Sequence, residues 1–278
     1  MNKIISKKVL SKSVTEMKIY APQILKHAQA GQFVMLRINE KSERIPLTIS
    51  DMDHENGLLT IIFQVIGSTT YELNELNVGD DILDLVGPLG KPTHIEGFKK
   101  VCVIGGGVGC AIAYPVAKAL SLKNVEVDVI IGFKSKNDMI LHQKFEKIAN
   151  HVFVSTDDGS YQTKGFVTDI LSDLLKNGQT YDHVFAIGPI IMMKMVSQLT
   201  AKYNIGTTVS LNPIMVDGTG MCGGCRVKVG KDIKFACVDG PDFDGHLVDF
   251  DLLQSRNNMY KETETKNYKC LAEKGGHS

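Results

Sequence analysis

Short hydrophobic runs separated by glycines fill the N-terminal third of the chain. The runs are Ile4–Leu10, Met17–Ala21, Gln32–Ile38, Leu58–Val65 and Asp81–Leu85, and the glycines between and after them are Gly57, Gly67, Gly79, Gly87 and Gly90. Segments of this length and spacing are typical of strands in a small antiparallel barrel. We therefore predict a β-barrel domain over residues 1–97, with one or two helical turns at Tyr71–Leu76.

The pattern changes after Lys100, where apolar runs alternate with stretches of helical period. The first run, Val101–Gly109, leads through a glycine-rich loop into a helical pattern at Ile112–Leu120. Later strands are predicted at Val125–Gly132, His151–Thr156, His183–Ile187 and Thr207–Leu211, and later helices at Asp138–Ala149, Phe166–Leu175 and Ile190–Lys202. This alternation predicts a doubly wound parallel sheet over residues 98–211. Such sheets bind ligands beyond the carboxyl ends of their strands.

Cysteines and glycines dominate the stretch that follows this sheet. It reads Asp217-Gly-Thr-Gly-Met-Cys222-Gly-Gly-Cys225, and Cys237 lies further on. The plant-type [2Fe–2S] spacing is C-x4-C-x2-C with a distant fourth cysteine, so Asp217 stands where the first cysteine would be. We predict a [2Fe–2S] site with three thiolates and one carboxylate, in a small module over residues 212–252, followed by a polar tail over residues 253–278.

Two other uses of this stretch stay open from its residues alone. Zinc is also bound by Cys-x2-Cys pairs, with a carboxylate or histidine among the remaining ligands. A Cys-x2-Cys pair can also serve as a pair of redox-active thiols. The glycine-dense loop favours a cluster over zinc, because bridging sulfides need several backbone N–H donors.

Composition excludes several classes of function. The 278 residues are 43% hydrophobic and 22% charged, and 31 basic residues balance 31 acidic ones. This balance leaves no basic field to attract nucleic acid or an anionic membrane. The six cysteines do not suggest a disulfide framework, which indicates a reducing compartment. With no signal-peptide pattern, and with glycines and a proline interrupting the uncharged run Val101–Ala117, we predict a cytoplasmic protein without a membrane segment.

Two segments of the barrel region are suited to a phosphorylated ring cofactor. In Arg44-Ile-Pro46-Leu47-Thr48-Ile-Ser50, the arginine can grip a pyrophosphate while the backbone lines a flat ring. In Gln64-Val65-Ile-Gly67-Ser68-Thr69-Thr70, a glycine turn presents three hydroxyls to phosphate oxygens. Each segment alone has a simpler explanation: Arg44 can be an ordinary surface arginine, and Gly67–Thr70 can be a plain turn into a helix. Their order within one barrel favours a cofactor site.

Three strand ends of the predicted parallel sheet carry residues suited to a dinucleotide. The Gly105–Gly109 loop opens a helix, where backbone N–H groups bind phosphate, although Cys110 takes the place of the third glycine of G-x-G-x-x-G. The segments Asp157–Ser160 and Gly188-Pro189 follow two later strands. Asp157–Gly159 is equally well explained as a simple turn.

Taken together, these elements resemble the ferredoxin reductase superfamily. The resemblance rests on Arg-x-Pro-Leu-Thr-x-Ser in the barrel, on Gly-Gly-Gly-x-Gly and Gly-Pro in the second domain, and on the cysteine module. Val216–Arg226 and Pro241–Asp249 are similar to iron–sulfur flavoprotein subunits related to the electron-transfer subunit of dihydroorotate dehydrogenase B. Within that group the chain most resembles the small (alpha) subunits of NADH-dependent ferredoxin:NADP+ oxidoreductases, and the resemblance covers essentially the whole chain.

The resemblance implies which residues hold each cofactor. FAD would be held in the barrel by Arg44, Pro46, Leu47, Thr48, Gln64, Val65, Gly67, Ser68 and Thr69. NAD(H) would be held in the second domain by Gly106, Gly107, Val108, Asp157, Asp158, Gly188 and Pro189. The cluster ligands would be Asp217, Cys222, Cys225 and Cys237. No catalytic acid or base is expected, and Ile187 replaces the cysteine that many relatives carry before Gly-Pro.

The implied function is electron transfer between NAD(H), FAD and the cluster, within an electron-bifurcating complex. The partner would be a larger subunit with a second FAD, [4Fe–4S] clusters and the NADP(H) site, through which ferredoxin is reached. The tail after Gln254 is a candidate docking segment. The alternatives are the electron-transfer subunit of a dihydroorotate dehydrogenase B-type enzyme, against which Asp217 argues, and a non-redox zinc-bearing binding module. Lys134 and Lys136 leave the choice between NAD and NADP open from the residues alone.

Overall fold

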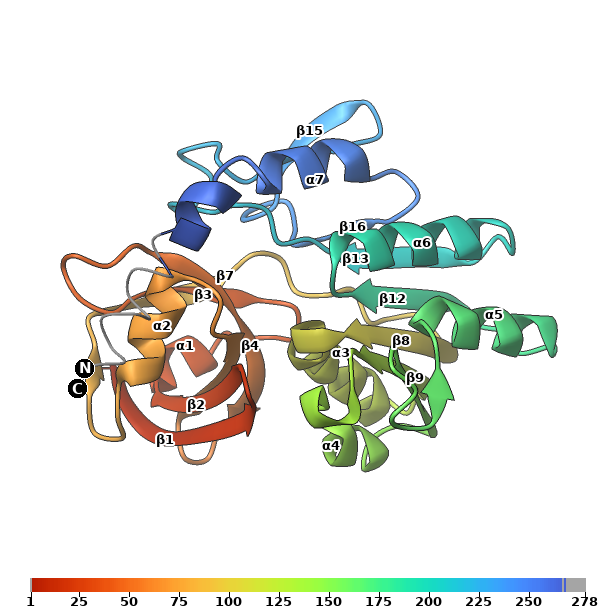
Figure 1. Ribbon diagram of the computed structural model, residues 1–278, viewed down its shortest axis with the longest axis horizontal. Helices are drawn as coiled ribbons and strands as arrows, with labels where there is room; N and C mark the ends of the chain where they lie inside the picture. The colour runs from red at the N-terminus through yellow and green to blue at the C-terminus, as the bar shows by residue number, and fades with distance from the viewer. Residues whose placement is uncertain (1, 267, 269–278) are drawn as a thin grey trace.

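The computed structural model describes residues 2–266 and 268, which form three parts (Figure 1). The N-terminal barrel lies on one side and the α/β domain on the other, and the C-terminal segment lies across both. Within the described residues, no helix is long and apolar enough to span a membrane.

One antiparallel sheet curls into the barrel, with strand order β6-β1-β2-β5-β4-β3-β7. Alternate side chains of its strands fill the interior, and Met17, Ile19, Leu59 and Ile61 are completely buried there. The strands are β1 (Asn2–Ser11), β2 (Val14–Tyr20), β3 (Phe33–Arg37), β4 (Ile45–Asp53), β5 (Leu58–Gln64), β6 (Asp81–Ile82) and β7 (Asp84–Leu89), and the helices are α1 (Pro22–Leu25) and α2 (Ser68–Glu75).

The hydrophobic pattern missed strand β4, which carries the Arg-x-Pro-Leu-Thr-x-Ser residues. A proline near the start of a strand and polar residues further on weaken the signal for a strand. In the structure β4 pairs with β3 and β5, and its register shifts between Ile49 and Asp51. Ile49 and Ser50 are buried, whereas Ile45 to Thr48 stay partly exposed. The predicted cofactor segment is therefore a strand with one open face.

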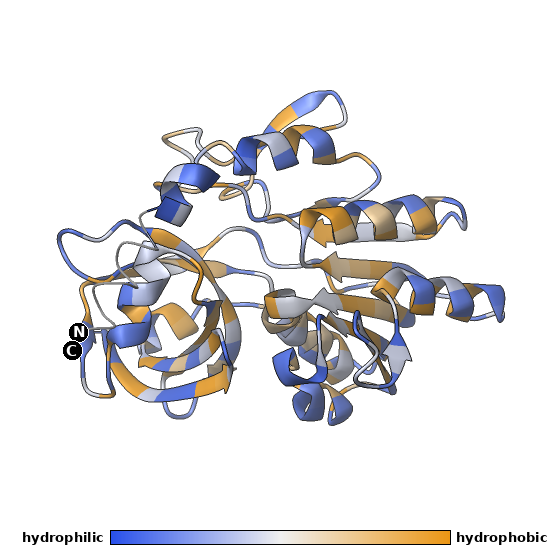
Figure 2. Cartoon of the chain, in the orientation of Figure 1, coloured by the Kyte–Doolittle hydropathy of each residue, from blue (hydrophilic) through white to orange (hydrophobic). Residues whose placement is uncertain are grey.

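The second sheet has the order β11-β10-β9-β8-β12-β13-β16, and all its neighbouring strands are parallel except β16. Figure 2 shows hydrophobic colour on central strands of this sheet and mixed colour on the covering helices α5 and α6. Its strands are β8 (Lys100–Gly106), β9 (Glu126–Phe133), β10 (His151–Thr156), β11 (Thr163–Lys164), β12 (His183–Ile187), β13 (Gly206–Ser210) and β16 (Asp242–Asp244). Its helices are η1 (Gly107–Gly109), α3 (Cys110–Leu122), η2 (Lys136–Asp138), α4 (His142–Glu146), α5 (Val167–Lys176) and α6 (Ile190–Ala201).

The predicted helix over Asp138–Ala149 is wrong. Only the short elements η2 and α4 occupy that stretch, and Leu141 between them has a left-handed backbone with φ of 60°. Such a residue ends a regular helix. The break lets Ile140 and Phe145, which are 3% and 0% exposed, both enter the core. The apolar spacing alone fitted a continuous helix equally well.

The C-terminal segment adds a hairpin of β14 (Arg226–Val229) and β15 (Asp232–Phe235), then β16 and helix α7 (Phe250–Asn257). Strand β16 pairs antiparallel with β13, so this segment is joined to the second sheet. Asp249 caps α7 by accepting a hydrogen bond from the Leu252 backbone N–H at 3.0 Å. Of the predicted docking tail, positions 267 and 269–278 lie outside the described residues.

His183 makes the α/β domain sensitive to acid. Its ring stacks on Phe98 with a centroid distance of 5.0 Å, and its Nε2 lies 2.8 Å from Thr208 Oγ1. Burial lowers the pKa of His183 to about 4. In the unfolded chain the pKa is about 6.5, so between these values the unfolded state binds more protons. The contribution of neutral His183 to the free energy of unfolding is therefore lost as the pH falls from about 6.5 toward 4.

We expect His183→Gln to remove this part of the acid sensitivity. Between about pH 7 and pH 4.5, the variant should lose about 1–2 kcal/mol less unfolding free energy than the wild-type protein. Chemical denaturation at a series of pH values measures this difference. His54→Gln, in an exposed turn, is the control and should follow the wild-type curve. Parallel curves for His183→Gln and wild type would contradict the prediction.

Candidate functional site

Two of the three predicted cluster cysteines form a close, buried pair. Cys225 and Cys237 are each 2% exposed, and their Sγ atoms lie 3.2 Å apart. Burial and the neighbouring Cys225 thiol raise the pKa of Cys237 to about 12. Two buried thiols at this distance cannot both ionise in the protein alone. A bound iron would relieve this cost, because thiolates are its preferred ligands.

The other two predicted ligands, Cys222 and Asp217, lie on the exposed side of the same loop. The Gly224 backbone N–H donates to Cys222 Sγ at 3.4 Å, and this bond is the main reason that the pKa of Cys222 is lowered. Asp217 Oδ2 accepts hydrogen bonds from the Thr219 hydroxyl and from the backbone N–H groups of Thr219 and Met221, at 3.0 and 3.4 Å for the latter two. These bonds, led by the Thr219 hydroxyl, hold the pKa of Asp217 below its usual value.

The arrangement fits a dinuclear cluster. Among the described residues, no group of three or more His, Cys, Asp or Glu side chains is arranged to hold a single metal ion. A [2Fe–2S] cluster instead distributes its ligands over two irons. The Cys225–Cys237 pair suits one iron, and Cys222 with Asp217 suits the other. The predicted donor set of three thiolates and one carboxylate is compatible with such a cluster.

The two predicted flavin segments lie next to one another in the barrel. Arg44 directly precedes β4, and its Nη2 lies 3.3 Å from Asp84 Oδ2. The second segment ends β5 and opens α2, whose N-cap is Gly67. The loop before Arg44 contacts α2, where Ser42 Oγ lies 3.2 Å from Glu72 Oε2. An arginine and a helix N-terminus on adjoining segments suit a pyrophosphate.

The predicted nicotinamide residues surround the point where the order of the second sheet reverses. Strand β8 is flanked by β9 and β12, so the loops after β8 and β12 diverge there. A Cβ at Gly109 would lie 2.5 Å from the Ile187 carbonyl oxygen, and one at Gly106 would lie 3.0 Å from Pro189 Cδ. The lack of a side chain at Gly106 and Gly109 allows the two loops to pack closely, while Gly107 and Val108 between them stay half-buried.

The acidic residues after β10 lie beside the loop after β9. Asp158 Oδ1 accepts hydrogen bonds from the Ser160 backbone N–H at 2.9 Å and from the Ser160 hydroxyl at 2.6 Å. These bonds, chiefly the one from the hydroxyl, lower the pKa of Asp158. Ser160 Oγ in turn accepts from the Lys136 N–H at 2.7 Å. The structure thus brings Asp157 and Asp158 to the same edge as the glycine loop, and Lys136 beside them.

The cluster loop rests directly on the barrel. Gly218, with φ of +84°, packs so tightly that a Cβ there would lie 2.5 Å from Met35 Cγ and 3.1 Å from Leu89 Cδ1. The charge of Arg44 also lowers the pKa of Asp217. The predicted flavin and cluster residues are therefore neighbours. The sequence pattern did not indicate this contact, since no local signal pairs Gly218 with β3 and β7.

Comparisons with known proteins identify the family. Residues 212–249 match the family model of the iron–sulfur cluster binding domain of dihydroorotate dehydrogenase B. A dihydroorotate dehydrogenase B (NAD(+)) electron transfer subunit homolog of Thermotoga maritima is 44% identical over 278 residues, which covers 100% of this chain and 98% of that protein. The chain belongs to the family of dihydroorotate dehydrogenase B electron transfer subunits and their homologues.

Further relatives and solved structures are similar to this chain. An uncharacterised protein in the adh 3′ region of Clostridium beijerinckii is 50% identical, covering 100% of this chain and 97% of that protein. A structure of an NADH-dependent reduced ferredoxin-NADP oxidoreductase, solved to understand flavin-based electron bifurcation, matches with a TM-score of 0.93 and 44% identity over 98% of both chains. A cytochrome P450 reductase of Amycolatopsis, at 18% identity and a TM-score of 0.61 over 72% of this chain and 65% of its own, shares the fold.

These findings confirm the predicted fold class, the family, the cofactor set of flavin, nicotinamide and iron–sulfur cluster, and the electron-transfer function at the level of the family. The chain is an oxidoreductase subunit for electron transfer. The roles of individual residues stay predictions, as do the domain boundaries.

Proposed function

We propose that this chain accepts electrons from NADH and passes them through FAD to the [2Fe–2S] cluster. The proposal is supported by the packing of Gly218 against Met35 and Leu89, because the loop of the predicted cluster ligands then lies next to the predicted flavin barrel. The nicotinamide loops after β8 and β12 belong to the adjoining domain. One chain therefore brings together residues suited to all three groups.

The chain's own residues bind and align these groups. When bound, FAD can accept an electron pair as hydride and release electrons singly, whereas the cluster accepts one electron. Arg44 and the α2 N-terminus would hold the FAD pyrophosphate, and the open face of β4 would lie against its ring. The barrel is joined to the nicotinamide domain by Lys118 Nζ, which lies 2.7 Å from Asp51 Oδ1. This ion pair helps to keep the two binding faces aligned.

The partner in this proposal is a larger subunit with a second FAD, [4Fe–4S] clusters and the NADP(H) site, within an electron-bifurcating complex that reaches ferredoxin. Support comes from the 44% identity over nearly the full length of the related ferredoxin-NADP oxidoreductase chain. Val216 and Met221 beside the cluster ligands are 61% and 87% exposed, which gives an electron acceptor an apolar surface to contact.

A dihydroorotate dehydrogenase B-type role is the second candidate. The electron transfer subunit of that enzyme from Fusobacterium nucleatum is 32% identical over 84% of this chain and 91% of its own. That likeness is weaker than the likeness to the ferredoxin-NADP oxidoreductase chain. Asp217 in place of the first cysteine of the four-cysteine spacing also favours the bifurcating complex.

NADH should reduce the purified chain faster than NADPH under anaerobic conditions. Asp157 and Asp158 follow β10, where their charge would repel a 2′-phosphate. Asp157→Ser should therefore reduce the preference for NADH by about tenfold in kcat/KM, because one unfavourable charge contact is removed. Flavin bleaching in a stopped-flow spectrometer measures both rates.

Asp173→Ser removes an equally exposed charge from α5 and serves as the matched control. It should leave the ratio of the two rates unchanged. Wild-type protein that is not reduced by either nucleotide would contradict the proposed function. An unchanged ratio in Asp157→Ser would contradict the role of this aspartate alone.

A further inference from the structure

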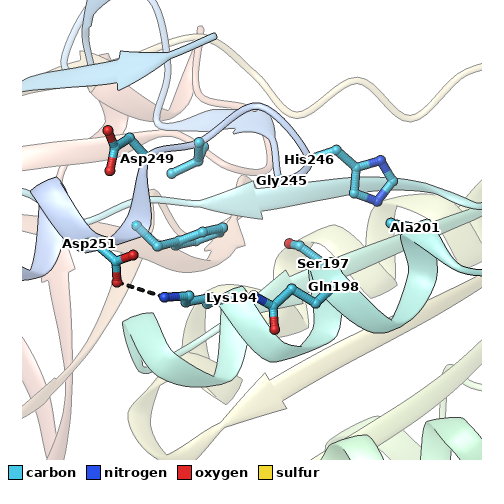
Figure 3. Close-up of a pocket in the computed structure, with 10 residues that line it drawn as sticks. Lys194, Ser197, Gln198, Ala201, Gly245, His246, Asp249 and Asp251 are labelled. Carbon is cyan, nitrogen blue, oxygen red and sulfur yellow. Dashed lines mark hydrogen bonds and ion pairs between the residues drawn. The ribbon is translucent and has the colours of Figure 1, made fainter.

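The segment Gly240–Asp249 fastens the cluster module to helix α6 and strand β13. Strand β16 within it pairs with β13, and the Leu211 N–H donates to the Pro241 carbonyl at 2.9 Å. Figure 3 shows the segment running along α6, with Gly245 and His246 near Ser197 and Ala201. Two polar contacts also join the C-terminal segment to α6. His246 Nε2 lies 3.1 Å from Thr200 Oγ1, and Lys194 Nζ lies 2.6 Å from Asp251 Oδ1.

The same segment also holds the linker between the barrel and the α/β domain. That linker follows β7 and precedes β8, at residues 90–99. The Lys91 N–H donates to the Gly240 carbonyl at 2.6 Å. Thr93 Oγ1 donates to Asp242 Oδ2, also at 2.6 Å, across 149 positions of sequence. Gly90, with φ of +76°, packs so closely that a Cβ would lie 3.0 Å from Pro241 Cδ.

The opposite side of the linker is bound to the barrel. The Thr93 N–H donates to the Ala30 carbonyl at 2.9 Å, and Gln32 Nε2 donates to the Gly90 carbonyl at 2.7 Å. Thr93 is 6% exposed and Gln32 is 7% exposed, so these bonds are shielded from water. Thr93 therefore bonds the barrel through its backbone and the cluster module through its side chain.

The Asp242 carboxylate uses the Thr93 hydroxyl as a hydrogen-bond donor. Burial raises the pKa of Asp242, whereas the Thr93 hydroxyl and the nearby Ser210 act in the opposite direction. Asp242 is half-buried, so a carboxylate that is partly shielded from water would lose a hydrogen-bond donor, which costs free energy. The loss of the Thr93 hydroxyl would therefore favour a rearrangement that exposes Asp242 to water, and such a rearrangement would separate the linker from Gly240–Asp242.

We propose that Thr93 and Asp242 are positioning residues, whose hydrogen bond keeps the cluster module at a set distance from the flavin barrel. The inference rests on the proposed function, because it concerns electron transfer from flavin to cluster within this chain. The rate of that transfer falls steeply with distance, so a small shift of the module slows it. Binding of nicotinamide and flavin involves other residues and should stay as in the wild-type protein.

Thr93→Val and Thr93→Ser form the matched pair that tests this. Valine keeps the shape of the side chain and removes the hydroxyl, whereas serine keeps the hydroxyl. The whole chain, loaded with flavin and cluster, is mixed anaerobically with NADH, and flavin bleaching and cluster bleaching are followed in one experiment. In Thr93→Val we expect flavin reduction at the wild-type rate and cluster reduction slowed several-fold, with recovery in Thr93→Ser.

A second readout does not depend on activity. Hydrogen–deuterium exchange at the amides of Lys91 and Thr93 reports opening of the linker directly. Faster exchange of the linker in Thr93→Val, with wild-type exchange in Thr93→Ser, is expected. If exchange and cluster reduction in Thr93→Val both match the wild type, the positioning role is wrong. Wild-type flavin that NADH fails to reduce would instead contradict the proposed function.

Discussion

Replacing Cys225 with alanine should remove the iron from the protein and leave its flavin in place. Cys225 is one of the two buried thiols 3.2 Å apart, and alanine offers no replacement ligand. A [2Fe–2S] cluster that loses a ligand at one iron is not retained, so iron should fall from about two per chain to nearly none. The barrel residues that would hold FAD lie in a separate sheet. Iron analysis and the visible spectrum measure the two cofactors separately.

Cys110→Ala is the control for this prediction. Cys110 is a fully buried thiol at the start of α3, and no cluster role is predicted for it. Its replacement should leave both iron and flavin at wild-type levels. If Cys225→Ala kept its full iron content, the assignment of this cysteine as a ligand would be wrong. Loss of flavin together with iron would show that the two sites do not load independently.

Asp217→Cys should keep the cluster and lower its midpoint potential. A carboxylate donates less electron density to iron than a thiolate does, so it stabilises the oxidised cluster less. Restoring the four-cysteine spacing should move the potential in the negative direction by on the order of 100 mV. For a one-electron couple, a shift of about 100 mV changes the equilibrium constant for reduction of the cluster by about fiftyfold.

A redox titration followed by electron paramagnetic resonance measures this potential in wild type and variant at one pH. Thr219→Val is a useful companion, because it removes the hydroxyl that bonds Asp217 Oδ2 while keeping all four predicted ligands. We expect a much smaller shift in that variant. An identical potential in Asp217→Cys and wild type would contradict ligation by the carboxylate.

Much of the fold was predictable because its signals are local. The strands of the α/β domain contain short apolar runs, and those at His151–Thr156 and His183–Ile187 match the prediction to the residue. Strand β4 was missed because Pro46 and its polar residues obscure the alternation. The helix predicted at Asp138–Ala149 failed because a left-handed residue at Leu141 leaves no mark in an apolar pattern.

The candidate site likewise has features with a local sequence signal and features without one. The candidate cluster ligands could be proposed from the sequence because Asp217, Cys222 and Cys225 follow a local spacing, and their role stays a prediction. The spatial arrangement of the predicted flavin and cluster sites could not be predicted from the sequence. It depends on the packing of Gly218 on the barrel and on the hydrogen bond from Thr93 to Asp242, which join residues far apart in sequence. Such contacts arise only when the three parts of the chain come together.

The most direct test of electron transfer from NADH to the cluster is a low-temperature electron paramagnetic resonance spectrum of the isolated chain after anaerobic addition of NADH. The proposed function predicts the signal of a reduced [2Fe–2S] cluster, and predicts that Cys225→Ala lacks it while its flavin is still bleached. Wild-type protein with bleached flavin and no cluster signal would contradict it.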